Sequence, residues 1–194
     1  MNLFDQIVDD SKLHQNFVSV LLPHRKAERD LLLSWADGFK DRDGKIIKEF
    51  QTTFNSSFWE IYLYALFKKY CFEIDWSNSS PDFSLKFGEN EFVVEATTAN
   101  AAQGKPNEWD KTLNPDELKG LTFFELNKEA IIRLSNSIYA KYKKYQNSYS
   151  KLPHVRNRPF IIAVAPFEQP YFNLQYDRPI RALLYDFMLM KMNI

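Results

Sequence analysis

Apolar residues recur at helical spacing in the first seventy residues of the chain. Two such patterns run from Leu3 to Leu22 and from Arg25 to Phe39, and a proline separates them. They predict a helical segment, residues 1–50, that packs on a core. The next pattern covers residues 57–70 and predicts a buried amphipathic helix, with Asn55 among its N-cap candidates.

The period of two that marks β-strands follows directly. Residues 71–76 predict a short first strand, and residues 83–87, where apolar and polar residues alternate, predict a second strand with one buried face. A hairpin at residues 88–90 connects it to a third, apolar strand at residues 92–96. Residues 160–165 are apolar throughout and predict a fourth strand that is buried.

The chain between the third and fourth strands predicts a polar surface loop, residues 97–121, followed by a long helix over residues 123–145. Residues 178–194 predict a last helix, which has no capping residue and is compatible with a chain that continues in a longer protein. This order of helices and strands predicts an α/β fold. We expect residues 51–194 and the N-terminal helices to form one compact domain.

Three acidic residues occupy unusual positions in this pattern: Glu60 in the first turn of the helix over residues 57–70, Asp82 after Pro81 at the start of the second strand, and Glu95 inside the apolar third strand. A buried carboxylate is costly unless it is paired or binds a metal. Asp82, Glu95 and the backbone carbonyl of Ala96 or Thr97 therefore form a candidate Mg²⁺ or Mn²⁺ site. The alternative is that Glu95 pairs with a lysine or arginine and that Asp82 caps a turn.

These residues resemble the PD-(D/E)XK, or restriction endonuclease-like, nuclease superfamily. The resemblance covers residues 54–165 and rests on Glu60, on Pro81-Asp82-Phe83, and on Glu95-Ala96-Thr97. It implies a core of helix, three strands, helix and strand, with the N-terminal helices as a cover. It also implies that Asp82, Glu95 and Ala96 hold the metal and that Glu60 supports the metal or its waters.

The superfamily usually carries a lysine two positions after the strand acid, where this chain has Thr97. Members move this lysine to a neighbouring helix, and residues 133–163 are similar to an uncharacterised bacterial branch of the fold. We favour Lys141, because it shares a helical face with Leu134 and Ile138, whereas Lys143 and Lys144 are expected to face solvent. The resemblance implies that Lys141 positions the attacking water or stabilises the transition state.

The formal net charge is zero at pH 7, which gives no global argument for a nucleic-acid partner. The distribution is less even, because no aspartate or glutamate occurs between Ala130 and Phe167. Lysines, arginines and tyrosines are interleaved there and predict contacts with phosphates. The candidate nucleic-acid-binding residues are Arg133, Lys143, Lys144 and Lys151, and the alternative is a solvated helix face.

Several other classes of protein are disfavoured. The single Cys71 allows no disulfide framework, the three histidines lack the spacing of a zinc site, and no phosphate-binding glycine motif occurs. The first residues lack the basic residues of a secretory signal, and no apolar run approaches the roughly 18 residues of a membrane span. We therefore expect a soluble, cytoplasmic protein with no membrane partner. The resemblance adds a homodimer as a candidate assembly.

The leading hypothesis is a metal-dependent nuclease that hydrolyses phosphodiester bonds in DNA or RNA. In it, Asp82 and Glu95 bind Mg²⁺ or Mn²⁺, and Glu60 and Lys141 assist. A second hypothesis is a catalytically inactive binding or scaffolding module of the same fold, which the residue Thr97 favours. A third is a two-carboxylate hydrolase such as a glycosidase.

Overall fold

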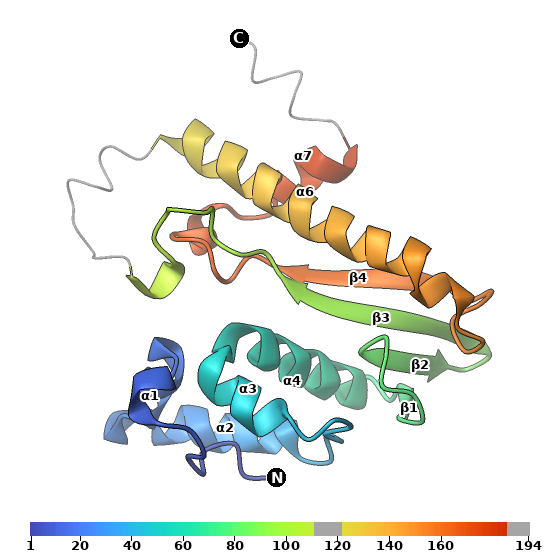
Figure 1. The fold of residues 1–194 in the computed structure, drawn as a ribbon, viewed down its shortest axis with the longest axis horizontal. Coiled ribbons are helices and arrows are strands. Elements are labelled where there is room, and N and C mark those ends of the chain that lie inside the picture. Colours follow the sequence, from blue (N-terminus) through green and yellow to red (C-terminus); the bar gives the residue numbers. More distant parts are fainter. Residues whose placement is uncertain (111–121, 186–194) are drawn as a thin grey trace. The chain divides into compact units, whose positions relative to one another are not determined.

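A computed structural model of the protein describes residues 1–110 and 122–185 (Figure 1). The fold is mixed α/β, as the sequence predicts, with an open four-stranded sheet. The α-helices in the described residues are α1 (Gln15–Leu21), α2 (Lys26–Ala36), α3 (Ile46–Thr52), α4 (Phe54–Lys69), α6 (Phe123–Asn147) and α7 (Arg178–Tyr185). The strands are β1 (Glu73–Asp75), β2 (Phe83–Phe87), β3 (Asn90–Thr98) and β4 (Phe160–Ala165). None of the described helices is long and apolar enough to cross a membrane.

The chain divides into two compact units. The first unit is Met1–Thr97 with Lys144–Ala163, and the second consists of the described residues within Thr98–Lys143 and Val164–Ile194. Each unit is therefore built from two separate parts of the sequence. The predicted boundary at residue 50 stays a prediction.

The sheet is mixed, with the strand order β1-β2-β3-β4. Strand β2 is antiparallel to both β1 and β3. Strand β4 runs parallel to β3, because the backbone N–H of Val93 donates to Pro159 at 2.9 Å and the N–H of Ala99, further along, donates to Ala165 at 2.7 Å. The strand predicted over residues 160–165 has these bounds, but it is not buried throughout, because Ile161 is exposed and only Ala165 is fully buried.

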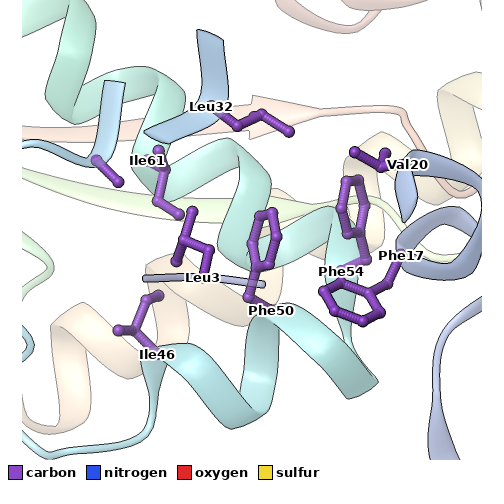
Figure 2. Packing of buried hydrophobic residues seen from close by; sticks show 9 residues of the cluster. Leu3, Phe17, Val20, Leu32, Ile46, Phe50, Phe54 and Ile61 are labelled. Atoms are coloured by element: carbon purple, nitrogen blue, oxygen red, sulfur yellow. The ribbon is translucent and has the colours of Figure 1, made fainter. Parts of the chain in front are cut away.

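Helix α4 is buried on two sides and organises the core of the first unit (Figure 1). On one side, Phe54 and Ile61 pack with the N-terminal helices, and Figure 2 shows these side chains in one apolar cluster. The buried residues of that cluster are Leu3, Phe17, Val20, Leu32, Ala36, Ile46, Phe50, Phe54 and Ile61. On the other side, Leu63 and Tyr64 pack on the sheet through Phe83, Leu85, Val94 and Ala96. Since both faces of α4 are covered, its apolar residues are not confined to one side of the helix.

The structure corrects the sequence prediction near the N-terminus. Residues 3–14 form turns and a 3₁₀-helix (Asp10–Lys12) instead of the first part of an α-helix, and α3 was not predicted. Helix α4 begins at Phe54, so Asn55 lies inside the helix and is not its N-cap. Its side chain accepts a hydrogen bond from Asn16 at 3.0 Å, which ties α1 to α4.

The other elements agree with the prediction within the described residues. The hairpin, β2 and β3 are present, and the long helix extends two residues beyond its predicted end. The predicted loop over residues 97–121 includes a 3₁₀-helix (Glu108–Asp110), and its last eleven residues lie outside the described residues. The last helix is described as far as Tyr185, so the rest of its predicted range also lies outside them.

The aromatic cluster around Phe50 should control the stability of the first unit. Phe50 is fully buried and packs edge-on against Phe4 and Phe17. Replacement by alanine removes the buried ring and leaves a cavity. Phe50→Ala should therefore lower the free energy of unfolding, measured by urea denaturation, by about 3–5 kcal/mol. Leu31→Ala, at an exposed position of α2, is the control and should change it by less than about 0.5 kcal/mol. Equal losses in both variants would contradict this account of the core.

Candidate functional site

The β2–β3 hairpin brings Asp82 and Glu95 to corresponding positions on neighbouring strands. Phe83 pairs with Val94 in the antiparallel register, so one step further along Asp82 comes opposite Glu95. A two-residue turn at Gly88-Glu89 sets this register, and Gly88 has the positive φ of 60° that such turns need. Like charges directly opposite each other destabilise a sheet, so these two carboxylates require compensation.

Asp82 is held by backbone and by Arg42. Its Oδ2 atom accepts a hydrogen bond from the backbone N–H of Ala96 at 2.7 Å. The guanidinium of Arg42 donates to the backbone carbonyl of Asp82 at 2.7 Å and also to that of Asn78. It lies 5.6 Å from the centre of the Trp76 ring, which adds a cation–π contact. Arg42 thus fastens the loop that carries Asp82.

Glu95 is a buried carboxylate with a cationic partner. Because side chains alternate along β3, it lies on the face of Val93, opposite the face of Val94 that packs against α4. Only 1% of its side chain is exposed, and its Oε1 atom lies 3.1 Å from the Nζ atom of Lys144. This ion pair compensates a charge that would otherwise be costly to bury.

Lys144 reaches Glu95 from the end of α6 and stays partly in water, with 49% of its side chain exposed. Its Nζ atom also lies 4.7 Å from the centre of the ring of Tyr149, which is buried. Desolvation lowers the pKa of Lys144, but the hydrogen bond to Tyr149 and the charge of Glu95 outweigh it and raise the pKa to about 12. Lys144 is therefore charged at every pH at which the protein is expected to work.

Glu60 lies on α4 and is largely removed from water. Burial raises its pKa most, the charges of Asp82, Glu49 and Glu95 raise it further, and Arg42 lowers it, so that the pKa rises from its ordinary 4.5 to about 8. Glu60 is therefore mainly protonated at neutral pH. A carboxylic acid that is kept neutral by burial and by neighbouring acids is typical of sites that do chemistry or bind cations.

A cavity of about 170 Å³ gives Glu60 and Asp82 a shared opening. Its volume is enough for several waters. The acids that line it are Asp41, Asp43, Glu49, Glu60 and Asp82, and the bases are Lys40 and Arg42. The excess of acids should concentrate cations in this cavity.

The oxygen donors near Asp82 and Glu95 are of the types that a hard divalent cation uses. Magnesium is usually held by one or two carboxylates together with carbonyl oxygens and waters, and Asp82, Glu95 and the Ala96 carbonyl supply that chemistry. Among residues 1–110 and 122–185, no cluster of three or more His, Cys, Asp or Glu side chains is close enough to hold a metal ion. Any such ion would therefore depend on backbone and water for its remaining ligands.

Lys144, which was expected to face solvent, has 49% of its side chain exposed, and its Nζ atom also pairs with the buried Glu95. The lysine expected at the site was Lys141, which belongs to the second unit, so its role stays a prediction. A long and flexible side chain at the edge of a helical face can turn toward the core, and this is what assignment by helical face misses.

The remaining basic candidates lie on both units. In the second unit, the Nε atom of Arg133 donates to the backbone carbonyl of Asn100 at 2.8 Å, and Nζ of Lys143 lies 5.3 Å from the centre of the Tyr139 ring. In the first unit, Lys151 is exposed in a 3₁₀-helix (Tyr149–Lys151). Their contacts with nucleic acid stay a prediction.

Sequence reasoning missed three residues around the carboxylates. Arg42 lies in a turn forty residues before Asp82. Tyr149 is one of several tyrosines in the basic stretch, and nothing in the sequence distinguishes it from the others. His154 lies in a turn, and its Nε2 atom lies 2.8 Å from the carbonyl oxygen of Ser80, two residues before Asp82. No local pattern marks such contacts, because each joins segments that are distant in sequence.

Comparisons with known proteins do not assign the chain. No protein-family model matches it, and searches of curated proteins and of solved structures also found no match. The function must therefore be inferred from the geometry of the site.

The protonated state of Glu60 predicts a pH-dependent stability. Below about pH 4.5 the carboxyl group is protonated in both states, but between pH 4.5 and 8 only the unfolded chain ionises, so folding becomes less favourable as the pH rises. Glu60→Gln removes this effect. The free energy of unfolding of the variant should therefore gain on that of the parent by up to about 1.4 kcal/mol per pH unit over this range.

Urea denaturation at pH 5, 6, 7 and 8, in buffer with a chelator, measures this difference. Glu73→Gln, at an exposed position on β1, is the matched control, and its free energy of unfolding should differ from that of the parent by the same amount at each pH. A difference between Glu60→Gln and the parent that stays constant with pH would show that Glu60 ionises normally in the folded protein.

Proposed function

We propose that this protein is a metal-dependent nuclease of the PD-(D/E)XK type that hydrolyses phosphodiester bonds in DNA or RNA. The observation that carries the proposal is the register of β2 and β3, which sets Asp82 opposite Glu95. A restriction endonuclease-like core is part of the proposal. The order α4, β1–β3, α6, β4 supports it, since it has the helix, three strands, helix and strand of that core.

Asp82, Glu95 and the carbonyl of Ala96 would hold Mg²⁺ or Mn²⁺. When bound, such an ion activates a water for attack and neutralises charge that develops on the phosphate. Glu60 lines the same cavity as Asp82 and adds a carboxyl group that can hold the waters around the ion. The acidic lining of that cavity supports cation binding independently of the resemblance.

We choose Lys144 as the lysine of the site, because the position at which the superfamily usually has this lysine is occupied by Thr97. Its ammonium group is already 3.1 Å from Glu95, and half of its side chain is exposed. It can therefore reach a phosphate oxygen that approaches from solvent and stabilise the negative charge there. Lys141 remains the alternative lysine.

Binding of the nucleic acid would use basic residues in α6 and in the chain that follows it. Lys151 is exposed in the first unit, and Arg133 and Lys143 belong to the second. Phosphate contacts of this kind carry no base specificity and should make binding strongly dependent on salt.

A catalytically inactive binding module of the same fold is the second candidate. The observation in its favour is that each strand acid has a partner already: Asp82 accepts from the Ala96 N–H, and Glu95 pairs with Lys144. In this interpretation the ion pair only stabilises the fold, and no metal is needed.

Metal binding separates the two candidates. In calorimetric titrations of Mn²⁺ at moderate salt, the parent should bind and Asp82→Asn should not, because the amide loses the charge but keeps an oxygen for the Ala96 N–H. Asp75→Asn, on β1, is the control and should bind like the parent, since the Asp75 carboxylate accepts from the backbone N–H of Ser77. No binding to the parent would favour the inactive module, and binding that survives in Asp82→Asn would place the ion elsewhere.

Nuclease activity tests the role of the ion pair. The parent should cleave single- or double-stranded DNA or RNA with Mg²⁺ and lose this activity with a chelator. The double variant Glu95→Gln/Lys144→Met removes both charges together, so it avoids an unpaired buried charge and should keep its melting temperature while cleavage falls by about 100-fold or more. Cleavage that is equal in the parent and in this folded double variant would rule out both residues as catalytic groups.

A further inference from the structure

A second cavity, of about 680 Å³, lies within the second unit. It is formed by the chain after β3, by the first half of α6 and by the segment that follows β4. Its apolar walls come from Ala102, Pro106, Leu126, Ile132, Pro170 and Tyr171. This volume lies in the range of about 300–1,000 Å³ that is typical of pockets for small molecules.

Two buried glutamine side chains line this cavity. Gln169 and Gln175 are 4% and 2% exposed, and Nε2 of Gln175 donates to Oε1 of Gln169 at 3.1 Å. Among the described residues, Nε2 of Gln169 and Oε1 of Gln175 have no hydrogen-bond partner. The pair therefore keeps one NH₂ group and one C=O group without a partner. If nitrogen and oxygen are exchanged in both amides, one NH₂ group and one C=O group still have no partner.

The backbone N–H groups of both glutamines are paired. The N–H of Gln169 donates to Pro166, and the N–H of Gln175 donates to Phe172. The unpaired atoms, Nε2 of Gln169 and Oε1 of Gln175, both belong to the side-chain amides. Buried polar atoms without partners disfavour folding, so their presence in a cavity wall points to a ligand that completes them.

The charges at this cavity oppose one another. Lys105, Lys128 and Arg133 line it together with Glu125 and Glu129. Two of these side chains have partners: Thr122 donates to the Glu125 carboxylate at 2.6 Å, and Arg133 donates to the Asn100 carbonyl. With charges of both signs close together, the cavity has no strong preference for an ionic ligand.

We propose that this cavity binds a neutral small molecule with an apolar body and an edge that presents an N–H donor beside a C=O acceptor, as a carboxamide or lactam does. The ligand's carbonyl would accept from Gln169, and its N–H would donate to Gln175. The terminal torsion of glutamine is broad, so a modest turn of either amide brings its buried atom to the ligand. This site is separate from the carboxylates of the proposed nuclease and does not depend on that function.

Benzamide is a suitable first probe, because it has one apolar ring and one primary amide. N,N-dimethylbenzamide is the matched comparison, since it keeps the carbonyl and lacks the N–H. Titration of each into the full ¹⁵N-labelled protein, followed by NMR, should show saturable shifts at residues 169–175 for benzamide and at least about tenfold weaker binding for the dimethyl compound.

Gln175→Met removes both polar atoms at similar volume and should weaken benzamide binding by at least about tenfold. Gln6→Met, in the first unit, is the control variant and should bind like the parent. The proposal is overturned if benzamide shows no saturable binding, or if both probes bind equally well to the parent. The comparison of the two probes needs no variant, so the proposal stays testable even if Gln175→Met does not fold.

Discussion

Helix α4 is covered on both sides, and this double burial determines the rest of the first unit. Phe54 and Ile61 of α4 pack in the N-terminal cluster, while Leu63 and Tyr64 pack against the sheet. Trp59 adds a direct link, because its Nε1 atom donates to the carbonyl of Ala163 in β4 at 2.9 Å. A helix held from two sides cannot rotate to expose one polar residue. Glu60 is therefore kept beside apolar packing, and its raised pKa follows from its position in the fold.

The two strand acids are held by a different constraint, which is the register of the hairpin. A shift of one residue would move every side chain of β3 to the opposite face and would expose Val94 or bury a charged residue against α4. The register that buries Val94 and Ala96 on α4 is the one that sets Glu95 on the other face and opposite Asp82. Hydrophobic packing thus brings two carboxylates together, although their mutual repulsion opposes it. Arg42 and Lys144 supply the compensating positive charge.

The sequence predicts those parts of the fold whose signal is local. The alternation at Phe83, Leu85 and Phe87 together with the turn at Gly88 was enough to place β2, β3 and their acids. Local signals did not place the start of α4. Asn55 and Ser57 are good N-cap residues by type, but both are buried inside the helix, and Asn55 accepts a hydrogen bond from Asn16 there. Arg42 and the pairing of Lys144 with Glu95 were missed for the same reason. Each acts through a side chain that reaches a partner far along the chain, and periodicity contains no information on such contacts.

The asymmetry of the Glu95–Lys144 pair bears on what the site can do. Glu95 is 1% exposed and is fixed in a central strand, whereas Lys144 is 49% exposed at the end of a helix. If the pair is broken, the lysine regains most of its hydration and the glutamate does not. The acid therefore needs a positive charge at all times, while the lysine can exchange Glu95 for another anion at little cost. A divalent cation beside Glu95 would meet the need of the acid and release the lysine for a phosphate. In a purely structural ion pair, a lysine that remains half in water would be a weak way to stabilise the fold, and this favours a site in which its partner changes.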